Sequence, residues 1–415
     1  MSTTTPIQTK KVKITQIEDT LPFKTPRTVF WKLYFGPWTW LFRILSWIIP
    51  KQPNLYIFGS NEGLYFSDNS RAMFEYIQAN DKSVRVIWFT KSRKVYSEIE
   101  QKYPGSAVIS PSLRAAFIYL RAEQAVISYG FQDLCKMPWI PSIRINQLWH
   151  GIPIKKIGLL RDSQKTVTDY GPTWPIFMKW MNKVNRFFVA SEYEKKALSV
   201  ALGVPENRFI LSGNPRNDDL YDFKKQQHET SKLILYTPTF RVRGNYENRV
   251  LMHPKIDEVT LNDFLQKNDA KLIFRPHWIE KSSSFSQDNI QCIPHEQEPD
   301  LYQLFKQADI LVTDYSSAFI DWLILDKPVI FASYDLDEYT ENNGFLDLYQ
   351  NLVPSPVCTE ADQVFEEIRR AIHEPDFYQE ERKKFRRKYL GDAAGNICDR
   401  VWKSMTSSEG TKGEL

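Results

Sequence analysis

The sequence predicts an α/β protein built from two successive units, each with a parallel sheet covered by helices. From residue 54 onward, short apolar runs alternate with stretches of helical periodicity, the pattern of strand–helix–strand units in a parallel sheet. A polar, broken stretch at 214–231 interrupts this series before it starts again. The chain has 415 residues, which is long for one hydrophobic core. We therefore expect two units joined by a linker, with a cleft between them.

The first series contains four apolar runs of the kind found in buried strands. Each ends in a small or polar turn, and they lie at residues 54–60, 84–90, 124–130 and 186–191. Helical spacing occurs at residues 70–80, 111–123 and 192–202. These elements predict a first Rossmann-like domain at residues 52–222.

The second series has four further apolar runs, at residues 232–240, 270–277, 308–317 and 327–333. They predict a second Rossmann-like domain at residues 231–375. The remaining residues, 376–415, are highly charged and are expected to form helices and a tail. We interpret the basic run at 382–388 as a solvated helix face, with membrane contact as the alternative.

The first 51 residues differ in charge from the rest of the chain. They hold eight Lys/Arg and two Asp/Glu, a net charge of +6, which leaves −2 of the total of +4 for residues 52–415. A basic N-terminal segment on an otherwise nearly neutral protein indicates that this segment binds an anionic surface.

This basic segment is also rich in aromatic and aliphatic residues, but charges and a Gly-Pro pair interrupt residues 29–50. No run of about 18 apolar residues remains, so we do not expect a spanning helix. Trp38, Trp40 and Trp47 beside Arg43 suit the headgroup region of a bilayer. We expect residues 1–51 to form an amphipathic, membrane-associating segment. A helix buried against the protein's own body is the alternative.

Several classes of protein are disfavoured by composition and motifs. The four cysteines form no CxxC pair, which argues against a zinc site and a disulfide framework. No basic stripe is interleaved with aromatics, so nucleic acid is a poor candidate for a partner. The GxxxxGKS, GxGxxG, HExxH and GxSxG motifs are absent. Asp335 and Asp337 could bind a divalent ion, but such a pair is usually an ordinary acidic loop, and we expect no metal.

Polar groups follow several of the expected strands, where open α/β folds bind ligands. In "ILVTDYSSAF" a strand runs into Asp314, Ser316 and Ser317 and then into a helix. Hydroxyls at such a helix start suit a phosphate, and ordinary capping of the helix is the alternative.

Other strand ends carry basic and hydroxyl groups. They include Arg275 and His277 in "FRPHW", Thr239 and Arg241 in "YTPTFR", Arg216 in "SGNPRND", and His150 in "QLWHGIPIKKIG". Arginine and histidine can hold a phosphoryl group and balance the charge that develops on it. Each motif alone is weak evidence, but their common position after strands favours one site.

Together these motifs resemble the CDP-glycerol glycerophosphotransferases, the primases and polymerases of teichoic acids, with relatives that build phosphate-containing capsules. The resemblance covers roughly residues 54–400 and is carried by the Trp-His-Gly block and the Thr-Asp-Tyr-Ser-Ser block. It implies a GT-B architecture, in which two Rossmann-like domains face each other across a cleft. It also implies a peripheral protein at the cytoplasmic face of the bacterial cell membrane, acting on a lipid-linked acceptor.

By this resemblance His150 and His277 correspond to two essential histidines, and Ser316 and Ser317 lie at the phosphates of a CDP-alcohol bound to the second domain. Without the long amino-terminal extension of the large polymerases, the resemblance leads us to expect a shorter, primase-like or capsule-type member. Asn396 stands where a serine is usual in the closing block.

The resulting hypothesis is transfer of glycerol phosphate, or a related polyol phosphate, from a CDP-alcohol to a hydroxyl, with release of CMP. His150 is the expected base, because a neutral imidazole is available near pH 7. The donor phosphates are expected to contact His277, Ser316, Ser317, Arg275, Thr239 and Arg241. The acceptor side or the cleft is expected to contain Gly151, Lys155, Lys156, Arg216 and Asp314. No cofactor is expected.

Two other functions remain open from the sequence. A glycosyltransferase of the same architecture would use a nucleotide sugar in cell-surface polysaccharide synthesis, and architecture alone does not separate the two. A membrane-bound binding module without turnover is the other. No residue visibly distinguishes CDP-glycerol from CDP-ribitol.

Overall fold

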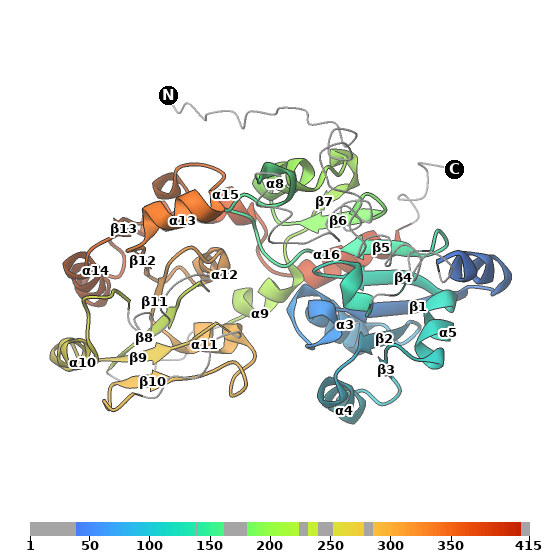
Figure 1. Ribbon diagram of the computed structural model, residues 1–415, viewed down its shortest axis with the longest axis horizontal. Helices are drawn as coiled ribbons and strands as arrows, with labels where there is room; N and C mark the ends of the chain where they lie inside the picture. The colour runs from blue at the N-terminus through green and yellow to red at the C-terminus, as the bar shows by residue number, and fades with distance from the viewer. Residues whose placement is uncertain are drawn as a thin grey trace, which may run out of the picture. The chain divides into compact units, whose positions relative to one another are not determined.

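Two parallel β-sheets, one in each of two compact units, organise the chain (Figure 1). The structure is a computed structural model that describes residues 39–135, 137, 140–161, 181–223, 231–239, 252–277 and 285–407. Every pairing between named strands is parallel. The expectation of two α/β units with parallel sheets is confirmed.

The division of the chain differs in two places from the expected segments. Unit 1 comprises residues 1–150, 157–218 and 393–415, and unit 2 comprises residues 151–156 and 219–392. The short segment 151–156, which follows His150 directly, therefore belongs to the second unit. The chain returns from unit 2 to unit 1 at residue 393, within the charged region expected at residues 376–415.

The sheet of unit 1 has the strand order β3-β2-β1-β4-β5-β6-β7. Its strands are β1 (Gln52–Gly59), β2 (Arg85–Thr90), β3 (Ala107–Ile109), β4 (Ala122–Ile127), β5 (Arg144–Gln147), β6 (Arg186–Val189) and β7 (Phe209–Leu211). The helices are α3 (Asp68–Asn80), α4 (Arg93–Lys102), α5 (Leu113–Arg121), α8 (Glu192–Leu202) and α16 (Ile397–Thr406). The order reverses between β1 and β4, and the carboxyl ends of the strands at such a reversal are where doubly wound sheets usually bind ligands.

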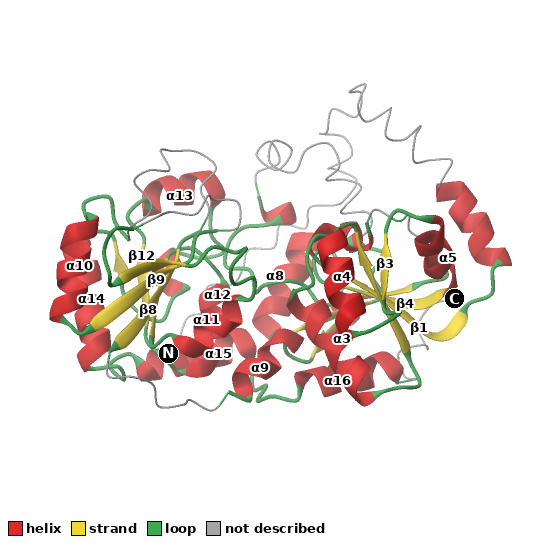
Figure 2. Cartoon of the chain, turned by 90° about the horizontal axis from the view of Figure 1, so that it is seen from below, coloured by secondary structure: helices red, strands yellow, loops and turns green. Residues whose placement is uncertain are grey.

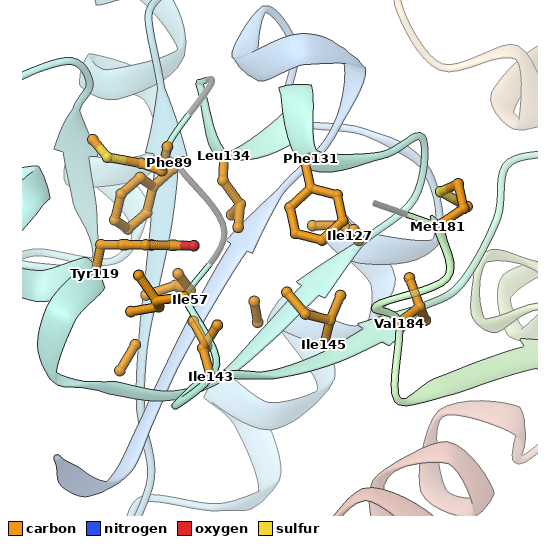
Figure 3. Close-up of a cluster of buried hydrophobic side chains, with 14 of the residues drawn as sticks. Ile57, Phe89, Tyr119, Ile127, Phe131, Leu134, Ile143, Ile145, Met181 and Val184 are labelled. Atoms are coloured by element: carbon orange, nitrogen blue, oxygen red, sulfur yellow. The ribbon is translucent and has the colours of Figure 1, made fainter. Parts of the chain in front are cut away.

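Alternation along β1 divides the core of unit 1 between two faces. Figure 2 shows α3 on one face of the sheet and α5 on the other. Phe58 packs edge-to-face against Phe74 of α3, with ring centroids 5.7 Å apart. Ile57 points the other way, into a cluster with Tyr119 of α5 and Phe131 (Figure 3). Both faces are thus buried, which explains the apolar run Leu55–Phe58 within β1.

The sheet of unit 2 has the order β10-β9-β8-β11-β12-β13, and it too reverses direction once, between β8 and β11. Its strands are β8 (Lys232–Thr237), β9 (Ala270–Phe274), β10 (Ile290–Cys292), β11 (Ile310–Thr313), β12 (Val329–Ala332) and β13 (Val357–Cys358). Its helices are α10 (Glu258–Lys267), α11 (Leu301–Gln307), α12 (Ala318–Trp322), α13 (Leu336–Asn343), α14 (Ala361–His373) and α15 (Gln379–Leu390), and α9 (Asp218–Tyr221) spans the boundary between the units.

The helices of unit 2 cover both faces of its sheet. Leu261 of α10 and Ile368 of α14 share one cluster with Ile234 of β8. On the opposite face Phe319 of α12 packs edge-to-face on Phe331 of β12, with centroids 5.0 Å apart. Figure 2 shows α10 and α14 on one side of these strands and α12 on the other.

A helix at residues 39–48 precedes β1 and divides its apolar residues between two environments. Phe42 and Leu45 pack against the core of unit 1. Trp40, Ile44 and Trp47 are exposed, with Trp40 at 65% and Trp47 at 78% of their full accessibility. Part of the expected membrane-associating segment, residues 39–48, therefore forms a helix that packs one face against the core of unit 1. Trp38 and the residues before it lie outside the described part of the chain.

Candidate active site

In unit 1 His150 follows shortly after the end of β5 and contacts the loop that comes after β4. Its side chain is partly buried. Its Nδ1 lies 3.2 Å from the backbone carbonyl oxygen of Ser128. Its ring stacks on Tyr129, with centroids 4.1 Å apart and planes 6° apart. Because a carbonyl oxygen only accepts, Nδ1 carries the proton and Nε2 carries the lone pair. The surroundings thus present Nε2 as the basic atom of this side chain.

The pKa of His150 is lowered from its ordinary value. Burial is the largest cause, and the charge of Arg216 also lowers it, whereas Asp68 and the Ser128 carbonyl raise it. A lowered pKa keeps the imidazole neutral at pH 7, which is the state that a general base requires.

A buried carboxylate supports the loop that holds His150. Asp133 is fully buried and accepts hydrogen bonds from the backbone N–H groups of Ser128, Tyr129 and Gly130, at 2.7 to 3.2 Å, and of Glu62 at 3.0 Å. Burial raises the pKa of Asp133 to about 6, although these N–H groups lower it. Each buried N–H that lost this partner would cost about 1–3 kcal/mol, so Asp133 fixes the position of the Ser128 carbonyl.

Asn69, at the start of α3, supports the residues that connect β5 to His150. It is fully buried, and its side-chain amide donates to the carbonyl oxygens of Leu148 at 3.2 Å and Trp149 at 2.9 Å. Its Oδ1 accepts from the backbone N–H of Arg216 at 3.0 Å. Trp149 has a φ of +55°, which is uncommon for a bulky residue. The amide of Asn69 therefore secures the unusual turn that carries His150.

Arg216 pairs with an acidic residue of its own unit. Its Nη1 lies 2.6 Å from Oδ1 of Asp68, and both side chains are only 10% exposed. This ion pair is close enough to His150 for both charges to act on its pKa. Arg216 was expected at the acceptor side or the cleft, and the structure brings it together with His150 through Asp68 and Asn69.

In unit 2 the expected donor-side residues follow three adjacent strands, β9, β8 and β11. The carboxylate of Asp314 bridges two of these ends. Its Oδ1 accepts from the backbone N–H groups of Thr239 at 2.8 Å and Tyr315 at 2.6 Å. Asp314 is buried and thus holds the loops after β8 and β11 together at the point where the strand order reverses, the usual ligand position in such sheets. Arg241 lies outside the described residues.

The two serines after β11 have different surroundings. The hydroxyl of Ser316 accepts from the backbone N–H of Ala318, the first residue of α12, at 3.2 Å. Ser317 begins α12 without capping it through its side chain. Gly151 lies directly beside Ser317, because a Cβ on Gly151 would stand 3.2 Å from Oγ of Ser317. The glycine keeps the space in front of this hydroxyl open.

His277 and Arg275 follow β9. Arg275 is buried; its Nη1 donates to the carbonyl of Ile293 at 3.2 Å, and its Nη2 lies 3.1 Å from Nδ1 of His295. Burial, together with the charges of Lys155, His295 and Arg275, lowers the pKa of His277 to about 4. His277 is therefore neutral at pH 7 and offers one N–H to a ligand.

The sequence missed several residues that organise these sites. Asp68, Asn69, Tyr129 and Asp133 support His150, and Tyr339 of α13 contacts Lys155. Only their burial and partners reveal them, because single polar residues in a helix or turn carry no sequence signal. Lys156, by contrast, is exposed. Asp335 accepts from the hydroxyl of Tyr315 at 2.8 Å, and no group of three potential metal ligands occurs in the described part of the chain.

Comparison with known proteins assigns the chain to a family. Residues 41–406 match the model of the CDP-glycerol:poly(glycerophosphate) glycerophosphotransferases. A teichoic acid glycerol-phosphate transferase of Staphylococcus aureus is 28% identical over 389 residues, which cover 87% of this chain and 96% of that protein. A teichoic acid glycerol-phosphate primase of Bacillus subtilis is 30% identical over 234 residues, which cover 54% of this chain and 58% of the primase.

Among solved structures, the wall teichoic acid polymerase TagF matches with a TM-score of 0.68 at 21% identity, covering 95% of this chain and all of the matched TagF chain. At this identity the likeness establishes the fold. The family model spans both sheets and every expected site residue. The chain belongs to the CDP-glycerol:poly(glycerophosphate) glycerophosphotransferase family.

Proposed function

We propose that the protein transfers glycerol phosphate from CDP-glycerol to a hydroxyl of a membrane-linked glycan or polyol-phosphate acceptor and releases CMP. The observation that carries this proposal is the set of polar groups at the ends of β9, β8 and β11, in a chain that belongs to the glycerophosphotransferase family. His277, Ser317 and Arg275 supply an N–H, a hydroxyl and a positive charge there. This combination suits a diphosphate.

The proposed chemistry is one displacement at the β-phosphorus of the donor. Nε2 of His150 takes the proton of the acceptor hydroxyl, and the acceptor oxygen bonds to the β-phosphorus. The bond from this phosphorus to the oxygen shared with the α-phosphorus breaks, and CMP leaves with the electron pair. His277 and Ser317 stabilise the charge that develops on the transferred group. Arg275 contributes its positive charge and contacts the side chain of His295.

For this displacement, the base of unit 1 and the donor groups of unit 2 must meet during the reaction. The proposal therefore includes the GT-B arrangement, in which the two Rossmann-like units bind acceptor and donor across a cleft. It also includes catalysis without a metal or cofactor, so we expect transfer to persist in EDTA.

The test is the product formed from two donors. Purified protein is given CDP-glycerol or CDP-ribitol with a lipid-linked acceptor, and CMP and the mass of the acceptor are measured. Ribitol is included because a teichoic acid ribitol-phosphate polymerase of Staphylococcus aureus is 26% identical over 282 residues. We expect an acceptor heavier by glycerol phosphate. Product formed only from nucleotide sugars would replace the proposal with glycosyl transfer.

We further propose that the protein binds the membrane as a peripheral protein through the helix at residues 39–48 together with α5. Phe42 of the first helix contacts Tyr119 of α5, with ring centroids 6.2 Å apart. Beside the exposed Trp40, Ile44 and Trp47, α5 exposes Leu113 and Phe117, with Leu113 at 91% of its full accessibility. Exposed large apolar side chains on two helices in contact indicate a membrane or protein partner.

Charge favours the membrane over a protein partner. Arg43 lies over the ring of Trp40 at 5.7 Å, and Arg121 lies over Phe117 at 5.4 Å. Aromatic rings with adjacent arginines suit the headgroup region of an anionic bilayer. No helix in the described ranges is long and apolar enough to cross a bilayer.

Exchange of Trp40 and Trp47 for aspartate is expected to release the protein from liposomes that contain anionic lipid. The change removes two interfacial anchors and adds negative charge. The exchange Val259→Asp on α10, at a side chain that is also exposed, is the matched control and should leave binding intact. Sedimentation with liposomes measures both variants. Undiminished binding of the double variant, with unchanged thermal unfolding, would refute this docking surface.

A further inference from the structure

Lys155 belongs to the donor unit, although it directly follows the block that contains the proposed base. Residues 151–156 are part of unit 2 and pair in antiparallel fashion with the residues after α13. Lys155 and Phe345 form a β-bridge, the backbone N–H of Leu346 donates to Ile154 at 2.9 Å, and that of Lys156 donates to Gly344 at 3.2 Å. This pairing fixes the position of Lys155 within the unit that holds His277 and Ser317.

The ammonium group of Lys155 is held by one aromatic side chain. Its Nζ donates to the hydroxyl of Tyr339 at 3.1 Å and lies 5.6 Å from the centroid of that ring. Tyr339 stacks on Tyr315, with centroids 3.9 Å apart and planes 25° apart. Because Tyr315 lies between Asp314 and Ser316, the stack connects Lys155 to the loop after β11.

The charge of Lys155 also reaches the end of β9. It is the charged group with the largest effect on His277, ahead of His295 and Arg275, and all three lower the pKa of that histidine. Lys155 therefore lies among the groups at the ends of β9 and β11. The sequence analysis had assigned it to the acceptor side or the cleft.

We propose that Lys155 is a catalytic residue of the donor site, where its ammonium group contacts the diphosphate and stabilises the charge on the departing CMP, while Tyr339 positions it before the donor binds. The inference rests on the proposed function and assigns a leaving-group role within it. As the bond from the β-phosphorus to the shared oxygen breaks, the electron pair stays on the CMP phosphate. Lys155 remains protonated, and the acceptor's proton goes to His150.

The test compares Lys155→Met, Lys155→Arg and Tyr339→Phe. Lysine and methionine have similar lengths, so Lys155→Met removes the charge and keeps most of the packing. We expect it to lower kcat by about 10²-fold or more, the usual effect of losing one stabilising group at a developing charge, and to weaken CMP binding. Lys155→Arg should restore part of both. Tyr339→Phe keeps the stack on Tyr315 and should have a smaller effect.

A control variant and an NMR titration separate this role from a structural one. Lys271→Met, on the exposed part of β9, is the control and should leave CMP binding unchanged. NMR titration should show that Lys155→Met raises the pKa of His277 above the value in the unchanged protein, because one of its positive neighbours is gone.

An unchanged kcat and CMP affinity in Lys155→Met, or an unmoved His277 pKa, would overturn the proposal. A defect confined to the KM of the acceptor would also overturn the proposal, because it would show that Lys155 acts on the acceptor. The CMP and NMR measurements need no turnover. They therefore decide the position of Lys155 even if the proposed transfer from CDP-glycerol fails, and the two failures are distinguishable.

Discussion

Replacing His150 by alanine is expected to lower the turnover of glycerol-phosphate transfer by roughly 10² to 10⁴ while leaving the binding of CDP-glycerol largely unchanged. A general base contributes about this factor. Donor binding should persist because His150 belongs to unit 1 and the proposed donor groups belong to unit 2. Steady-state kinetics and calorimetric titration with CDP-glycerol measure the two quantities separately.

His150→Gln sharpens this test. Glutamine keeps an amide that can donate to the Ser128 carbonyl, but it has no basic nitrogen, so we expect a comparable loss. His373→Ala, at the exposed end of α14, is the control. Thermal unfolding must show that the stacking partner Tyr129 has not been disturbed. Near-normal turnover in His150→Gln would eliminate the base assignment.

The pH dependence follows from the direction of the His150 pKa. Burial lowers this pKa from its ordinary value near 6.5, and the base must be neutral to accept the proton. The acid limb of kcat/KM is therefore expected below pH 6.5, with full base availability at pH 7. An acid limb centred above pH 7 would contradict this environment for His150.

Replacing His277 by alanine is expected to raise the KM for the donor and to lower kcat by about 10² to 10³, because a group aimed at developing charge is lost. The loss in kcat separates this role from simple donor binding. His373→Ala again serves as the control for a histidine outside the site. A change in KM without a change in kcat would mean that His277 contacts only the ground state.

The titration of His277 gives a second observable. In the free protein its pKa is about 4, below the ordinary 6.5, so between pH 4 and 6.5 the unfolded chain binds more protons than the folded one. This contribution to stability is present above pH 6.5 and is lost as the pH falls toward 4. A bound diphosphate offsets the charges of Lys155 and Arg275 and should raise the pKa of His277. CDP affinity should therefore increase as the pH falls from 6.5 toward 4, and His277→Ala should lose this increase.

The sequence predicted the long elements and the strand-end motifs because their signals are local. The run at 124–130 overlaps β4, and the helical spacing at 192–202 coincides with α8. Strands β3, β10 and β13 have three, three and two residues, too few for any periodicity to be recognised. The likeness to TagF and the two sheets agree with the expectation of two α/β units with parallel sheets.

The partners of the site residues could not be predicted, because they come from distant parts of the chain. Asn69 reaches Trp149 across 80 positions, and Lys155 reaches Tyr339 across 184. Lys155 was expected at the acceptor side or the cleft, where it could meet an acceptor's phosphates. The backbone pairing with residues 344–346 places it in the other unit, and no local pattern encodes such a pairing.

The central claim, transfer of glycerol phosphate to a hydroxyl, is tested most directly by matched acceptors with and without the terminal hydroxyl. CMP and extended acceptor are measured together after incubation with CDP-glycerol. We expect one CMP for each glycerol phosphate added to the hydroxyl-bearing acceptor, and neither product with the deoxy acceptor. CMP release from both acceptors, without any increase in acceptor mass, would identify a donor hydrolase and contradict the account.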